Sequence, residues 1–137
     1  MRRAVILLVF GVLFAAPSQA AAARVPTLAI SIVHVLHGCH VWTLGSRELG
    51  PTPVLRTKPG ARLKLRVSCP MSFDVVQTTG PKLALGNRRF VAGTTRTIVF
   101  PKPGVYRIVA RNVETSEEMG LQTLGPDNVL RLTVRVA

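Results

Sequence analysis

The feature that most constrains the fold is a series of short segments in which apolar and polar residues alternate, separated by residues typical of turns. Alternation with a period of two predicts a β-strand with one face in a core and the other in solvent. In residues 63–67, for example, Leu63, Leu65 and Val67 alternate with basic residues. The segments with strand character are residues 27–33, 63–67, 73–77, 95–100, 105–110 and 130–136.

Turn residues fall between these segments at regular intervals. Pro59-Gly60 and Pro103-Gly104 are the clearest, because proline fixes φ and glycine tolerates a positive φ. Each pair stands directly before a segment with strand character. About seven short strands at this spacing, with almost no helical signal, predict an all-β chain folded as a β-sandwich.

The first residues of the chain have the order of a cleavable signal peptide. Met1-Arg2-Arg3 is followed by an apolar stretch over residues 4–16 and then by small residues up to Ala23. The apolar stretch is shorter than the about 20 residues that a transmembrane helix needs. We expect cleavage after Ala20, with Ala22 and Ala23 as alternatives. Residues 1–20 are thus the predicted signal peptide, and residues 21–137 form one predicted domain that is secreted or held in the cell envelope.

The chain is strongly basic, with a formal net charge of +12. Removal of the predicted signal peptide lowers this charge only by the two arginines that follow Met1. The basic residues stand singly between apolar ones, as in Arg62, Lys64 and Arg66, and again in Arg131 and Arg135. Spacing by two predicts the solvent face of a strand. This pattern favours an anionic surface of the cell envelope as a partner over a specific nucleic-acid site.

All three histidines and one of the two cysteines fall within residues 34–40. Copper and zinc prefer imidazole and thiolate ligands, and a methionine thioether adds a weak, soft ligand suited to copper. On a strand His37 and Cys39 share one face and His40 the other, so the three converge only if Gly38 lets the chain turn. The predicted metal ligands are His37, Cys39, His40, Met71 and Met119.

The two cysteines allow a second interpretation. An exported protein with an even number of cysteines usually pairs them, and Cys39 and Cys69 are the only two here. On the chain-entropy model such a disulfide contributes about 3 to 4 kcal/mol of stability. It would also remove the thiolate that an electron-transfer copper site requires. The residues alone leave both alternatives open.

Catalytic motifs are not recognisable in the sequence. It has neither a glycine-rich phosphate loop nor a nucleophile elbow. Glu114, Glu117 and Glu118 lie in a polar segment and are expected to be solvated. The single tryptophan, Trp42, is predicted to anchor the core. We therefore expect a protein that is not an enzyme. An extracellular enzyme with a histidine-bound metal is the third hypothesis, and no acid-base residue accompanies the histidines to support it.

Residues 100–107, Phe-Pro-Lys-Pro-Gly-Val-Tyr-Arg, resemble the F-x-x-P/A-G-x-Y strand that precedes the metal-binding loop in cupredoxins. Together with the histidine-rich segment, Met71 and Met119, they make the chain similar to small exported bacterial cupredoxin-like proteins. The resemblance implies a Greek-key β-sandwich that binds one copper ion. It also implies electron transfer or copper handling in the cell envelope, with a redox partner protein, and we expect the chain to be a monomer.

The sequence departs from the cupredoxin pattern where the usual ligands stand. Residues 108–113, directly after this strand motif, contain neither cysteine nor histidine. Only Met119 could coordinate a metal in the late loop over residues 112–128, where one short helical turn is also expected. The resemblance therefore implies a rebuilt site in which Cys39 replaces the late cysteine, histidine completes the set, and Met71 or Met119 is the axial ligand.

Overall fold

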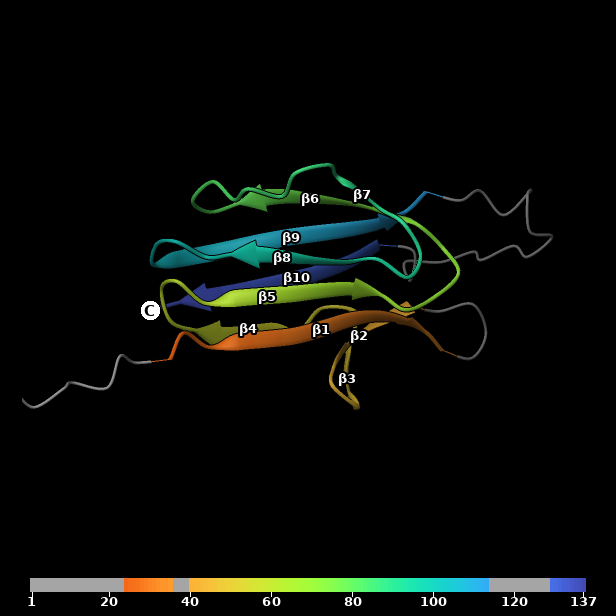
Figure 1. Cartoon of the computed structure of the whole chain (residues 1–137), viewed down its shortest axis with the longest axis horizontal. Helices are drawn as coiled ribbons and strands as arrows, with labels where there is room; N and C mark the ends of the chain where they lie inside the picture. The colour runs from red at the N-terminus through yellow and green to blue at the C-terminus, as the bar shows by residue number, and fades with distance from the viewer. Residues whose placement is uncertain (1–23, 36–39, 114–128) are drawn as a thin grey trace, which may run out of the picture.

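The structure is a computed structural model that describes residues 24–35, 40–113 and 129–137 (Figure 1). Within these ranges the chain forms ten strands and no helix. One sheet has the order β3 (Arg47–Gly50), β2 (His40–Leu44), β1 (Thr27–His34), β5 (Arg62–Val67) and β8 (Thr95–Val99). The other has the order β4 (Val54–Thr57), β10 (Val129–Val136), β9 (Gly104–Asn112), β6 (Phe73–Thr79) and β7 (Arg89–Phe90).

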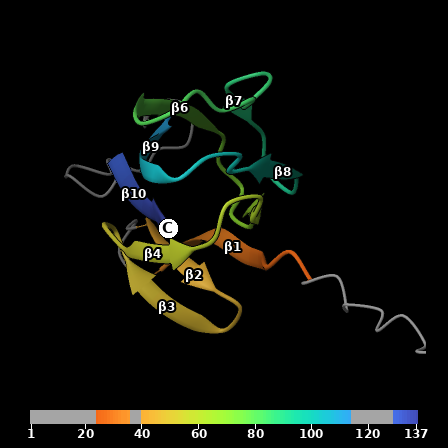
Figure 2. The same ribbon diagram turned by 90° about the vertical axis from the view of Figure 1, so that its left-hand side faces the viewer.

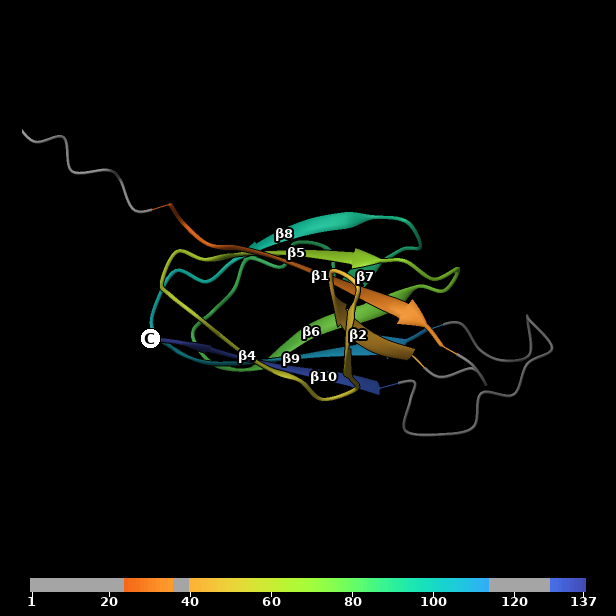
Figure 3. The same cartoon turned by 90° about the horizontal axis from the view of Figure 1, so that it is seen from below.

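The two sheets lie as separate layers, with β5 and β8 in one and β9 and β10 in the other (Figure 3). The chain passes repeatedly between the layers. Two pairs of neighbouring strands, β1 with β5 and β4 with β10, run parallel, and the other pairs run antiparallel. Parallel neighbours need a crossover connection, which here runs through the opposite sheet. The predicted all-β sandwich is confirmed.

All six segments predicted as strands are strands in the structure, but the expected total of about seven is too low. The four additional strands are β2, β3, β4 and β7, none longer than five residues. Too few residues alternate in such short strands to give a periodic signal. Pairing with neighbouring strands holds them in the sheets. The neighbour of β4 is β10, which is distant in the sequence.

The alternation in the sequence matches the burial of side chains in the sheets. In β5 the side chains of Leu63, Leu65 and Val67 are fully buried, whereas the basic side chains between them are exposed. Arg131 and Arg135 of β10 are exposed in the same way, so the predicted basic faces are confirmed. The largest fully buried side chains are Trp42, Tyr106, Phe73, Phe90 and Phe100, and Trp42 is the core anchor that the sequence predicts.

The F-x-x-P-G-x-Y segment has a structural role. The Tyr106 hydroxyl donates a hydrogen bond of 2.6 Å to the Lys102 carbonyl and accepts one of 3.3 Å from the Lys102 amide. The ring of Tyr106 packs against that of Phe100 with centroids 5.0 Å apart. The tyrosine thus fixes the bend at residues 102–103 that leads into β9, which begins at Gly104.

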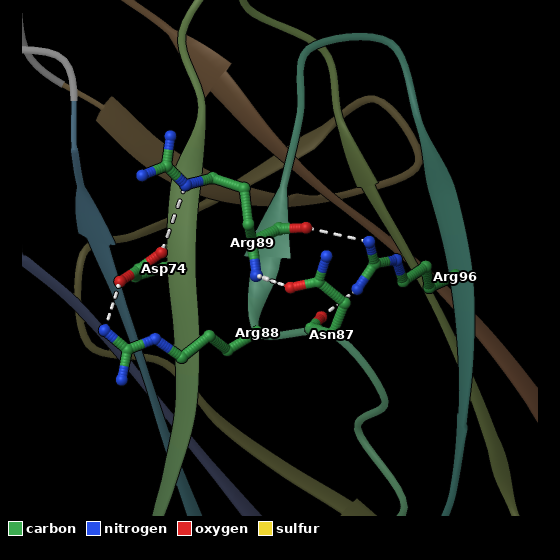
Figure 4. A network of polar contacts seen from close by, with 5 residues as sticks. All are labelled: Asp74, Asn87, Arg88, Arg89 and Arg96. Carbon is green, nitrogen blue, oxygen red and sulfur yellow. Dashed lines mark hydrogen bonds and ion pairs between the residues drawn. The ribbon is translucent and has the colours of Figure 1, made fainter.

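A network of arginines ties the edges of the two sheets together (Figure 4). Asp74 of β6 forms ion pairs with Arg88 at 3.0 Å and Arg89 at 3.3 Å. Arg96 of β8, in the other sheet, donates to the carbonyls of Asn87 and Arg89, the latter at 2.7 Å. Its guanidinium also lies 4.3 Å from the centroid of the Phe90 ring. The short strand β7 is therefore held from both sheets.

Candidate metal-binding site

The pairing of β1 with β2 brings two histidines together. His34 and His40 are the last register pair of these strands, and their rings lie edge to face with centroids 5.1 Å apart. Ile32 and Trp42 form the pair two residues further in, and both are buried in the core. Since alternate residues share a face, the histidines extend the core-facing row to the end of the sandwich.

His40 is buried between the two sheets. Its side chain is only 1% exposed, whereas His34 is exposed. The His40 ring also lies edge to face with the ring of Phe73, at 5.2 Å between centroids. Phe73 begins β6 in the opposite sheet. Contacts from His34 and Phe73 therefore define the orientation of the His40 imidazole.

The connection from β5 to β6 places two sulfur atoms at the same end of the molecule. Cys69 and Met71 are each 5% exposed. The Cys69 thiol lies 3.9 Å from the Met71 carbonyl, and the Met71 thioether accepts a hydrogen bond of 3.0 Å from the Asn112 side-chain amide. Asn112 ends β9 and is the register partner of Phe73, the residue that also contacts His40.

The strand directions explain why these residues share one end. β1, β5 and β9 finish there, and β2, β6 and β10 begin there (Figure 1). Figure 2 views the sandwich from the opposite end, where the C-terminus lies. We call the cluster of His34, His40, Cys69, Met71 and Asn112 the His40 end. It joins residues that are far apart in the sequence.

Of the five predicted ligands, the structure describes His40 and Met71, and it places both at the His40 end. His37, Cys39 and Met119 lie outside the described residues, as do the predicted helical turn and the three glutamates of the late loop. The described residues next to these two gaps also lie at this end. Val35 and His40 flank residues 36–39, and Val113 and Val129 flank residues 114–128.

The donor chemistry at the His40 end suits copper in part. Imidazole nitrogen and thioether sulfur are soft or intermediate ligands that copper accepts readily. Within the ranges that the structure describes, however, no group of three or more His, Cys, Asp or Glu residues is placed to hold a metal ion. The described donors alone therefore do not form a metal site, and the other predicted ligands, His37, Cys39 and Met119, lie outside the described residues.

Three residues of this cluster were not among the predicted ligands, and one of them, Cys69, was predicted only as a disulfide partner. His34 belongs to the histidine-rich segment, and a β-hairpin centred on residue 37 would have paired it with His40. Asn112 carries no comparable signal, because its contact with Met71 depends on the packing of β6 against β9. No disulfide is found among the described residues, and the predicted alternative of a Cys39–Cys69 bond involves a cysteine outside them.

The described part of the chain contains no helix, and therefore no helix that could cross a membrane. Comparison of the sequence with protein-family models and with curated proteins finds no match.

Several solved structures resemble the chain at low sequence identity. Rusticyanin from Thiobacillus ferrooxidans is 12% identical with a TM-score of 0.45, covering 85% of this chain and 79% of that one. Amicyanin from Paracoccus versutus is 15% identical with a TM-score of 0.40, covering 86% of each chain. A multicopper oxidase from Campylobacter jejuni is 15% identical with a TM-score of 0.42, covering 81% of this chain and 25% of that one. These similarities concern the fold alone. The strand order and register themselves show an all-β sandwich of two five-stranded mixed sheets.

Proposed function

We propose that the protein is an exported copper-binding protein that holds one copper ion at the His40 end. The observation that carries this proposal is the burial of the His40 imidazole and the Met71 thioether at one end of the sandwich, next to the segment that contains His37 and Cys39. A bound copper ion would supply one-electron redox chemistry. The role is then electron transfer to a redox partner protein or copper handling in the cell envelope.

The residues of the chain have separate roles in this proposal. His40, His37 and Cys39 would be the strong ligands of a bound copper ion, and Met71 or Met119 would be a further, weaker ligand. Phe73 and His34 orient the His40 ring through their edge-to-face contacts. The Asn112 amide orients the Met71 thioether with one hydrogen bond and leaves the second lone pair of the sulfur available. To bind copper, one nitrogen of each imidazole must carry no proton, and the Cys39 thiol must lose its proton to become a thiolate.

The test is a titration of the mature, reduced protein with Cu(II), followed by absorption spectroscopy and metal analysis. We expect one bound copper per chain and an intense visible band from the thiolate. Cys39→Ser should abolish the band while the far-UV circular dichroism stays unchanged. Met71→Leu and Met119→Leu conserve side-chain volume, so the one that shifts the band identifies the axial ligand. Full retention of the band in the Cys39→Ser variant would refute the thiolate assignment.

A second candidate is a metal-free sandwich with a Cys39–Cys69 disulfide. It is favoured by one observation, the burial of Cys69 at the same end as the strands that flank Cys39. A thiol assay on unfolded, unreduced mature protein separates the two candidates. Two titratable thiols per chain support the copper site, whereas none establishes the disulfide and removes the thiolate ligand. Mass spectrometry of the same sample tests the proposed export, since cleavage after Ala20 leaves Ala21 as the first residue.

A further inference from the structure

We propose that the outer face of the second sheet contains a binding site for a phosphate group, independent of the copper site. A groove crosses this face over β6, β9 and β10 and reaches the segment before β4. Its polar lining consists of three arginines and three threonines: Arg107, Arg111, Arg131, Thr52, Thr78 and Thr133.

The strand register explains how the three arginines converge. Arg131 of β10 is the register partner of Val109 of β9, and Arg107 and Arg111 stand two residues to either side of Val109. Arg131 is therefore the diagonal neighbour of both, at about 7–8 Å between backbone positions. Three guanidinium groups thus surround one point of the sheet.

The floor of the groove is apolar. Val109 points away from the core because it alternates with the buried Ile108 and Ala110, and yet it is only 8% exposed. Val76 of β6 is its register partner on the other side. Long arginine side chains can cover apolar surface with their stems while their charged heads stay in solvent. All three arginines line the groove together with Val109.

These arginines lack carboxylate partners within the described residues. Only Glu48 and Asp74 are acidic there, and Asp74 is already engaged by Arg88 and Arg89. No ion pair joins Arg107, Arg111 or Arg131 to either acid. Asp74 is the register partner of Arg111, so among the described residues one acid stands beside three groove arginines, and the groove retains an excess of positive charge.

A phosphate group fits this charge and geometry. The guanidinium fork matches phosphate oxygens in pairs, and a phosphate has enough oxygens to accept from three arginines, whereas a carboxylate has two. The hydroxyls of Thr52 and Thr133 are further donors at the rim. The phosphate could belong to a soluble molecule or to a phospholipid headgroup, and the test separates these sources.

The experiment measures binding of inorganic pyrophosphate to the mature protein by calorimetry at constant ionic strength, with acetate as a control anion. We expect saturable binding that weakens about tenfold in Arg131→Gln, the loss of one charge-assisted contact. The matched control is Arg66→Gln, an exposed arginine on the opposite sheet, which should bind as the unmodified protein does.

A second arm uses vesicles of phosphatidylcholine with and without phosphatidylglycerol. If the protein binds pyrophosphate but not the vesicles, and Arg131→Gln weakens this binding, the ligand is a soluble phosphate. If the protein binds only the vesicles with phosphatidylglycerol, and Arg131→Gln weakens that binding, the ligand is a lipid headgroup. The proposal is overturned if neither probe binds, or if Arg66→Gln weakens binding as much as Arg131→Gln. Copper binding is measured on the same variants, so a failure of either proposal is seen separately.

Discussion

At the scale of the residue, Gly80 shows how closely the backbone is packed after β6. A Cβ atom at this position would lie 2.5 Å from the Val105 carbonyl oxygen and 2.9 Å from the Tyr106 Cα, and the φ of +105° is itself unfavourable for other residues. Both neighbours are backbone atoms at the start of β9, so they cannot rotate away as a flexible side chain could. The fold therefore requires glycine here.

We predict that Gly80→Ala lowers the free energy of unfolding by about 3 kcal/mol or more, from backbone strain together with the steric overlap. The matched control is Gly45→Ala, where φ is +59° and no atom lies within 4 Å of the added Cβ. Its expected loss is only about 1 kcal/mol, from the left-handed backbone alone. Urea unfolding of both variants gives the comparison, and equal losses would contradict the packing argument.

At the scale of the element, β7 is too short to be stable by strand pairing alone. It has two residues and, among the described strands, pairs only with the start of β6. Arg96 of β8 supplies the additional support through two carbonyl contacts (Figure 4). Its guanidinium also lies over the ring of Phe90. One side chain from the first sheet thus fixes an edge strand of the second.

We predict that Arg96→Gln lowers the free energy of unfolding by about 1–2 kcal/mol, since Gln cannot make both carbonyl contacts or the contact with the ring. Hydrogen exchange of residues 87–90 should become faster, while exchange in β9 and β10 stays slow. Arg66→Gln, from an exposed position on the adjacent β5, serves as the control for loss of charge. Unchanged exchange at residues 87–90 would show that Arg96 does not hold β7.

The elements also show what local sequence can predict. β5 and β10 were predicted with the correct inward faces, because each has enough alternating residues to define a period. β2 was not predicted, and yet it carries His40 into the core. The contact of His40 with Phe73 and that of Met71 with Asn112 depend on the register between distant strands, which no local pattern contains. The histidine-rich segment contains His34 and His40 of the His40 end, but it gives no sign of the residues from distant strands that lie at the same end.

At the scale of the whole molecule, the outer faces of both sheets are basic. Arg62, Lys64 and Arg66 project from the first sheet, and the groove arginines project from the second. Positive charge on both faces of so small a domain is self-repulsive, and it favours solubility and anionic partners over stability. One like-charge pair is explicit in the register, since Arg135 of β10 stands beside Arg56 of the parallel strand β4.

We predict that Arg135→Glu stabilises the mature domain by about 0.2–1 kcal/mol at low ionic strength, since it replaces a like-charge cross-strand pair with an opposite-charge pair. Both side chains are exposed, so salt screens the interaction. For the unmodified protein the free energy of unfolding should therefore rise as sodium chloride is added, and for Arg135→Glu it should rise less. Arg135→Gln separates the loss of repulsion from the gain of attraction, because it removes the repulsion without adding an attraction. Its stability should lie between that of the unmodified protein and that of Arg135→Glu. If the stabilisation came from the charge of the whole surface rather than from this pair, Arg66→Glu on the opposite sheet would stabilise the domain as much as Arg135→Glu does.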